Sequence, residues 1–242
     1  MKEVCALKVR VKFSKYGPSR FLGHLDVMRY FQKAVRRAGI PIAFSSGFRP
    51  HMIMSFAAPL GLGVTSDGEY FDMELSRNMS SQDMIERFNE VLTEGFQVTG
   101  ARKTPEGKKH NAMALTAAAS YRVRLLQSAK IWPEDMAKQA ELFCAQPSIL
   151  VEKETKSGSK MADIKPGIYQ FQVDAGEFTM LLSASSANYV KPKMVMEAFA
   201  NWLEIPYSPY GFAVHKTEVY ANRGMEDAPD FVSLEELGED IE

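Results

Sequence analysis

The sequence of 242 residues contains few cysteines and no long apolar run. Its only cysteines, Cys5 and Cys144, form no Cys-x-x-Cys pair, and the three-cysteine cluster that an iron–sulfur radical enzyme needs is absent. No window approaches the ~18 uninterrupted apolar residues of a membrane span. The first residues lack the charged region, apolar run and cleavage site of a signal peptide. We therefore expect a soluble cytoplasmic protein without a membrane partner.

Charge is unevenly distributed, although the formal net charge is only −1. Residues 1–60 hold eleven Lys and Arg but two acids, whereas residues 226–242 hold eight acids and no Lys or Arg. A basic start suggests a surface for an anion, above all a nucleic acid. The alternatives are an ordinary solvated face, and an acidic tail that aids solubility or folds back onto the basic face.

Hydrophobic periodicity predicts the elements of the first half. Alternating apolar residues predict four strands, at residues 5–13, 52–58, 69–75 and 96–103. A repeat of 3.6 residues predicts a helix over 24–38, and Ser80 with Asp83 predicts the capped start of a second helix. The resulting order, β-α-β-β-α-β, is that of the split-βαβ or ferredoxin-like arrangement.

The same order recurs in the second half. Strands are predicted at 121–126, 149–154, 168–173, 178–184 and 213–220, with helices at 132–143 and 193–203. A turn is expected at 156–160 and a hairpin turn at 174–177. We therefore predict an α+β fold of two tandem ferredoxin-like units with antiparallel sheets, the second carrying an additional strand. The predicted boundaries are 1–103, a linker at 104–118, 119–222, and an acidic tail at 223–242 that is mobile or forms a loose helix.

The predicted first helix carries a basic outer stripe, with cations at Arg29, Lys33, Arg36 and Arg37, and Arg20 lies just before it. These cations repel one another at helical spacing but suit the negative end of the helix dipole. They are candidate contacts for RNA phosphates. For the last two arginines, the dipole interaction is an alternative explanation.

The loop Gly47-Phe48-Arg49-Pro50-His51 joins an aromatic ring to a cation. Glycine permits unusual backbone angles and proline stiffens the loop, so Phe48 and Arg49 could bind a base or a phosphate. In the alternative, Phe48 is buried in the core and Arg49 lies in solvent.

Two histidines, His24 and His51, lie among arginines and aromatic residues. They could share a pocket that binds phosphate or transfers a proton, because histidine titrates near neutral pH. The alternative is a local hydrogen bond near a helix start for His24 and at a loop closure for His51. With Asp26 they could supply three metal ligands, but the spacing matches no metal motif, so we expect neither metal nor other cofactor.

Lys160 and Asp163, in the second half, could reach a ligand or form a surface ion pair. Gly61-Leu62-Gly63 lacks the Lys-Ser/Thr ending of a phosphate-binding loop and precedes a strand, so it predicts a turn.

Several motifs match one family. They are Phe21-Leu22-Gly23-His24-Leu25-Asp26, Arg36-Arg37-Ala38-Gly39, Gly47-Phe48-Arg49-Pro50-His51, Ser55-Phe56-Ala57, Pro59-Leu60-Gly61-Leu62-Gly63 and Asp72, with Lys160, Asp163, Ile164 and Pro166 further on. In these the chain resembles the radical-SAM-linked proteins of bacteria, a domain of unknown function. Members occur beside or fused to a radical SAM protein with a cobalamin-type domain, which implies an accessory role and a radical SAM partner. The family has no established catalytic residues. Met52 and Ile53 depart from its pattern, which has proline and then a basic residue there.

Three functions remain open. The first is an accessory RNA-binding module, for tRNA or rRNA, that works with a radical SAM enzyme and is not catalytic on its own. The second is a metal-independent RNA-processing enzyme, with His24 or His51 as general acid–base and Arg49 stabilising charge. The third is a subunit whose basic stripe docks an acidic surface of the radical SAM protein.

Overall fold

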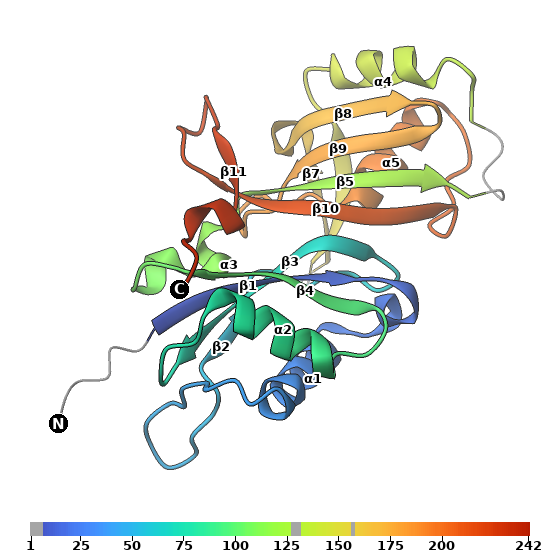
Figure 1. The fold of residues 1–242 in the computed structure, drawn as a ribbon. Coiled ribbons are helices and arrows are strands. Elements are labelled where there is room, and N and C mark those ends of the chain that lie inside the picture. The colour runs from blue at the N-terminus through green and yellow to red at the C-terminus, as the bar shows by residue number, and fades with distance from the viewer. Residues whose placement is uncertain (1–6, 127–131, 156–157) are drawn as a thin grey trace. The chain divides into compact units, whose positions relative to one another are not determined.

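A computed structural model describes residues 7–126, 132–155 and 158–242 (Figure 1). The fold is mixed α+β with antiparallel strand pairs, as predicted. The chain divides into two compact units: unit 1 is Met1–Thr116 with Glu218–Glu242, and unit 2 is Ala117–Thr217. Within the described residues, no helix is long and apolar enough to cross a membrane.

Unit 1 is built on four of the predicted strands. They are β1 (Leu7–Lys15), β2 (Met54–Phe56), β3 (Thr65–Leu75) and β4 (Phe96–Lys103). β1 lies between β3 and β4, β2 pairs with the far edge of β3, and all three pairings are antiparallel. Val11 of β1 lies opposite Phe71 of β3 and Ala101 of β4, which fixes the register of the apolar face.

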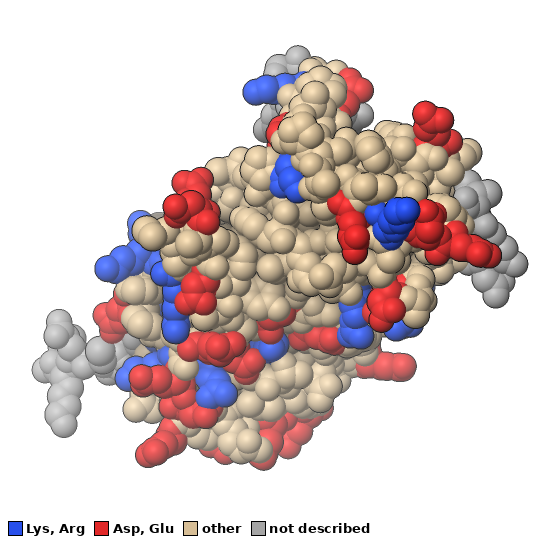
Figure 2. Space-filling view, turned by 90° about the horizontal axis from the view of Figure 1, so that it is seen from above, with Lys and Arg blue, Asp and Glu red and all other residues tan. Residues whose placement is uncertain are grey.

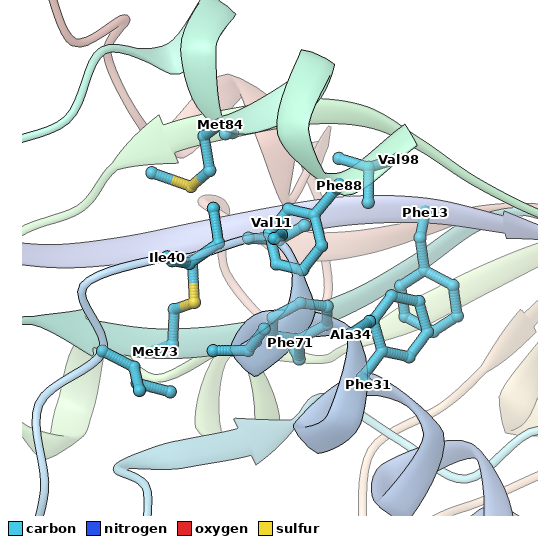
Figure 3. Close-up of a cluster of buried hydrophobic side chains, with 14 of the residues drawn as sticks. Val11, Phe13, Phe31, Ala34, Ile40, Phe71, Met73, Met84, Phe88 and Val98 are labelled. Carbon is cyan, nitrogen blue, oxygen red and sulfur yellow. The ribbon is translucent and has the colours of Figure 1, made fainter. Parts of the chain in front are cut away.

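Two helices, α1 (His24–Arg37) and α2 (Ser81–Val91), cover this apolar face. Figure 3 shows side chains from both helices meeting those of β1 and β3. Phe13 and Phe31 have ring centroids 4.5 Å apart, and both are almost fully buried. Ser80 caps α2 by accepting a hydrogen bond of 3.1 Å from the Asp83 amide, which confirms the predicted helix start.

Unit 2 has three paired strands and a core of its own. The strands β5 (Ala118–Leu125), β8 (Ile168–Asp174) and β9 (Glu177–Ser183) pair in the order β5-β9-β8. The helices α4 (Met136–Cys144) and α5 (Pro192–Trp202) contribute the buried Phe143 and Phe199. The predicted hairpin turn between β8 and β9 is confirmed, with positive φ at Ala175 and Gly176.

Part of one predicted turn or loop of unit 2, at 156–160, belongs to a strand instead. β6 (Leu150–Thr155) pairs with β7 (Gly158–Asp163) to form a separate two-stranded sheet. Residues 158–160 of the predicted turn therefore belong to β7, while 156–157 lie outside the described residues. The Ser-Gly-Ser composition favoured a loop, but residues 158–160 pair with Lys153, Glu154 and Thr155 at the end of β6, and this pairing overrides the local preference.

The acidic C-terminal segment is not a mobile tail or a loose helix. After β10 (Phe212–Asn222), β11 (Phe231–Ser233) pairs back onto the end of β10, and a short 3-10 helix follows at Glu235–Leu237. Leu234 is fully buried, and Glu239 exchanges backbone hydrogen bonds with Lys103 of β4. The predicted linker also holds structure, a 3-10 turn at Lys108–His110 and α3 (Ala112–Leu115).

Candidate nucleic-acid interface

A hairpin-like arm, residues 40–53, follows α1. Ala43 donates a backbone hydrogen bond of 2.7 Å to Glu74 of β3, and Ile53 donates one of 3.0 Å to Ala43. Further out, Phe44 and Met52 form a β-bridge, and the Ser45 amide donates to the His51 carbonyl at 2.9 Å. The arm is therefore anchored to the edge of β3, and its tip is residues 45–51.

Side-chain contacts close the base of the tip. Ser45 Oγ lies 2.8 Å from His51 Nδ1 and accepts the His51 amide at 3.1 Å. Gly47 has φ of +110°, a backbone conformation that other residues rarely adopt. Phe48 is fully exposed, with a relative accessibility of 105%. The alternative of a buried Phe48 is therefore wrong, and the tip presents a ring beside the exposed Arg49.

The basic stripe of α1 is also exposed, at all four predicted positions. Arg29 has a loose contact with Asp26, 3.8 Å between nitrogen and oxygen. Among the described residues, Lys33, Arg36 and Arg37 have no carboxylate within ion-pair distance. The last two lie in the final turn of α1, and the Gly39 amide donates to the Arg36 carbonyl just before the arm begins. The cations of the α1 stripe and the aromatic tip of the arm thus lie on consecutive segments of unit 1.

The acidic segment has its ion pairs elsewhere. Glu235 and Asp240 pair with Lys12 of β1 and Arg102 of β4, at 3.0 and 2.5 Å, and no described ion pair joins the segment to α1. The alternative of an acidic tail folded onto the basic face therefore holds at Lys12 of β1, but no described ion pair joins the tail to the stripe of α1. On the face shown in Figure 2, acidic and basic side chains are interleaved without a broad area of one sign.

The two histidines line different cavities. The ring of His24, the first residue of α1, is nearly perpendicular to that of Phe56, with centroids 5.7 Å apart. His24 also lines a cavity of about 10 Å³ with Lys15 and Glu69. That volume suffices for about one water molecule. His51 instead lines an open pocket of about 230 Å³ with Lys8 and Asp72. The prediction of a pocket shared by His24 and His51 is not supported by this geometry. No group of three His, Cys, Asp or Glu in the described chain is placed to hold a metal.

Of the two second-half candidates, Asp163 has a local structural role. Asp163 Oδ1 accepts the amides of Ile149 and Lys165, both at 2.9 Å, and so fixes the turn that ends β7. Lys160 is exposed and lies opposite Lys153 in the β6–β7 pair. Neither side chain is near the arm in sequence, and Asp163 is used for backbone capping.

A buried ion pair was not predicted from the sequence. Arg10 of β1 contacts Asp72 of β3 through Nε and Oδ1 at 2.9 Å, and both residues are almost fully buried. Arg10 also donates to the carbonyls of His110 and Leu234, at 2.8 and 3.1 Å, and Asp72 accepts the Ala112 amide at 2.6 Å. Both side chains thus have several partners within the protein, and removing either one would leave a buried charge without compensation. Strand alternation gave no signal for the pair, because it places Arg10 on the polar side of β1.

A second polar network lines an open cleft of about 670 Å³ on the same face of the sheet. Lys12 Nζ lies 2.7 Å from Glu218 and 3.0 Å from Glu235, and Tyr70 donates to Glu218 at 2.7 Å. Burial lowers the pKa of Lys12, but the hydrogen bonds and charges of both glutamates outweigh it and raise that pKa above 10.5. Burial, together with Glu218, raises the pKa of Tyr70. Sequence reasoning missed this network because its members are far apart in the chain.

The fold and the exposed arm define an α+β protein with a basic, aromatic surface on unit 1. A family model described as "Uncharacterized protein conserved in bacteria (DUF2344)" matches residues 8–192. The match covers more than half of the chain, so the protein belongs to this family. A comparison with curated proteins found no match.

Proposed function

We propose that the protein is an accessory RNA-binding module that holds RNA with the arm tip and the last turns of α1. The observation that carries this proposal is Phe48, fully exposed beside Arg49 on a tip closed by Ser45 and His51. An exposed ring on a fixed loop is ready to stack on a nucleotide base, which contributes about 1–3 kcal/mol per base.

Free cations support the same reading. Lys33, Arg36 and Arg37 face solvent, and no described carboxylate pairs with them. The helix dipole favours cations near the C-terminus of α1, but it does not supply them with a binding partner. Each cation that meets a phosphate releases a counterion. Ring stacking by the tip and phosphate contacts by the helix would together hold a single-stranded or looped region of RNA.

The partner and the RNA are further parts of the proposal. The resemblance of unit 1 motifs to radical-SAM-linked proteins supports a role in presenting tRNA or rRNA to a radical SAM enzyme. Since His24 and His51 line separate cavities, they do not form a joint acid–base site, and the enzyme alternative depends on one of them alone.

We also infer that both units have the split-βαβ arrangement. Unit 1 has the element order β1-α1-β2-β3-α2-β4 and the strand order β4-β1-β3, with β2 beside β3. Unit 2 has the same alternation once the β6–β7 hairpin is treated as an insertion. RNA-binding proteins with tandem units of this kind offer an analogy at the level of fold only.

The test is RNA binding by arm variants. Fluorescence anisotropy with labelled tRNA and rRNA fragments should show that Phe48→Ala weakens binding about 5- to 100-fold, the equivalent of one lost stacking contact. Tyr210→Ala, which removes an 87% exposed ring from unit 2, is the matched control and should leave the affinity unchanged.

The helix is tested through salt dependence. Arg36→Ala with Arg37→Ala should reduce the slope of log affinity against log salt by about 2, one unit for each lost phosphate contact. Arg77→Ala, an exposed arginine outside the stripe, should leave the slope unchanged. Equal affinities for wild type and Phe48→Ala in every RNA would refute the proposal. RNA cleavage that His51→Ala abolishes would favour the enzyme instead.

A further inference from the structure

Large apolar side chains are exposed at the N-terminal end of α1. Phe21, Leu25 and Leu62 are 64%, 63% and 69% exposed, and Leu22 is 37% exposed. They come from two segments that a hydrogen bond joins, because the Gly63 amide donates to the Arg20 carbonyl at 2.9 Å. We call these four side chains the apolar patch. Adjacent exposed apolar groups of this size mark interaction surfaces.

The backbone beneath the apolar patch is fixed. Lys15, itself buried, donates from Nζ to the Leu22 carbonyl at 2.8 Å, and the Leu22 amide donates to Ser19 at 2.9 Å. Leu60, next to Leu62 in its segment, lines the small cavity together with His24. The apolar patch is thus held in place before any partner arrives, which lowers the entropic cost of binding.

Charges around the apolar patch narrow the choice of partner. The Arg20 guanidinium lies over the Phe21 ring, 4.7 Å from its centroid. Arg29, one helical turn after Leu25, is 71% exposed and has only the loose contact with Asp26. A second copy of the chain would bring these cations against their own equivalents in a two-fold contact. Acidic groups on the partner would pair with both cations.

We propose that the apolar patch docks an apolar segment of another protein whose flanking residues are acidic. The RNA interface lies at the other end of α1, a helix of 14 residues and therefore about 21 Å long. The docking surface does not depend on the proposed RNA binding, and either can fail alone.

The experiment selects displayed random peptides on the full-length protein and measures the affinities of the enriched peptides by anisotropy. Enriched peptides should carry spaced apolar anchors with Asp or Glu beside them. Leu25→Ser with Leu62→Ser should weaken their binding at least about tenfold, as expected when buried anchors of a docking site are removed. Met113→Ser with Leu142→Ser removes two exposed apolar side chains elsewhere and should change nothing.

A separate pair of variants tests whether the cations beside the apolar patch attract the acidic residues of the partner. Arg29→Glu should weaken the acidic peptides several-fold by placing like charges together, whereas Arg77→Glu should not. A milder pair, Leu25→Ala with Leu62→Ala, replaces the serine variant if circular dichroism shows that the latter is unfolded. RNA affinity of the variant Leu25→Ser with Leu62→Ser should stay at the wild-type value, which separates this proposal from the proposed function.

Four results would overturn the proposal. The first is a selection that enriches no peptide, and the second is binding that the docking variants leave unchanged. The third is self-association in sedimentation velocity that Leu25→Ser with Leu62→Ser abolishes, which would make a second copy the occupant. The fourth is binding to phosphatidylcholine–phosphatidylglycerol vesicles that the same variant abolishes, which would make a lipid surface the occupant.

Discussion

The ion pairs of Arg10 and Asp26 show that the loss of a charged partner affects stability differently at a buried and at an exposed site. Arg10 is 1% exposed and its guanidinium is held by Asp72 and two carbonyls. Asp26 faces solvent, and its contact with Arg29 is loose. Removing one partner of a buried pair leaves a charge without compensation, while exposed pairs contribute little.

We therefore predict that Asp72→Asn lowers the free energy of unfolding by about 3–5 kcal/mol, because the Arg10 charge stays buried without a carboxylate. Urea unfolding at neutral pH measures the change. Asp26→Asn is the matched control and should cost about 0–1 kcal/mol. Equal losses for the two variants would show that burial of the Arg10–Asp72 pair does not matter.

At the scale of elements, the apolar faces were predictable and the polar faces were not. Periodicity located β1, α1, α2 and the β8–β9 hairpin, since each buries one face against its neighbours. The same alternation would place Lys8 and Arg10, which lie between apolar positions of β1, on a solvent-facing side. Both are buried, because residues 107–112 and Leu234 supply partners to them from distant parts of the sequence.

The candidate site was predictable to a similar degree. Exposure of the α1 stripe followed from helical spacing, and the Phe48 loop stood out by its composition. Closure of that loop by Ser45 and His51 did not, because it depends on the bridge between Phe44 and Met52 that brings the ends together.

The network that joins β1, β3 and β10 predicts a loss of stability at high pH. The pKa values of Lys12 and Tyr70 are both raised in the folded state, so each contribution is complete below the unfolded value and declines as pH rises above it. The free energy of unfolding should thus be insensitive to these groups up to about pH 10. Above it, Tyr70 alone should cost about 1.4 kcal/mol per pH unit.

Urea unfolding of wild type and Tyr70→Phe between neutral pH and pH 11 checks this. The variant loses the hydrogen bond to Glu218 at neutral pH, but its stability should fall less steeply above pH 10. Tyr210→Phe, at an 87% exposed position, should keep the wild-type slope. Parallel curves for wild type and Tyr70→Phe would contradict the prediction.

At the scale of the molecule, unit 1 is made from both ends of the chain. The residues from Glu218 onward join a unit that otherwise ends at Thr116. Composition alone suggested an acidic tail, since its eight acids resemble those of a solvated segment. Four of its apolar residues are nevertheless buried or half-buried: Phe231, Val232, Leu234 and Ile241. Ile241 packs against the unit 1 core. Sparse apolar residues between acids gave no periodic signal.

This arrangement predicts that the C-terminal segment is required for the stability of unit 1. Deleting residues 225–242 removes the fully buried Leu234, the carbonyl that Arg10 Nη1 contacts at 3.1 Å, and the Ile241 amide that donates to Ser81 at 2.9 Å. Burial of one such leucine contributes about 1.5–3 kcal/mol, and an unsatisfied buried donor costs about 1–3 kcal/mol. We expect the truncated protein to unfold at much lower urea concentration, and its unit 1 amides to lose hydrogen-exchange protection. Deletion of Glu242 alone is the control. A truncated protein as stable as that control would mean that the segment lies on unit 1 without stabilising it.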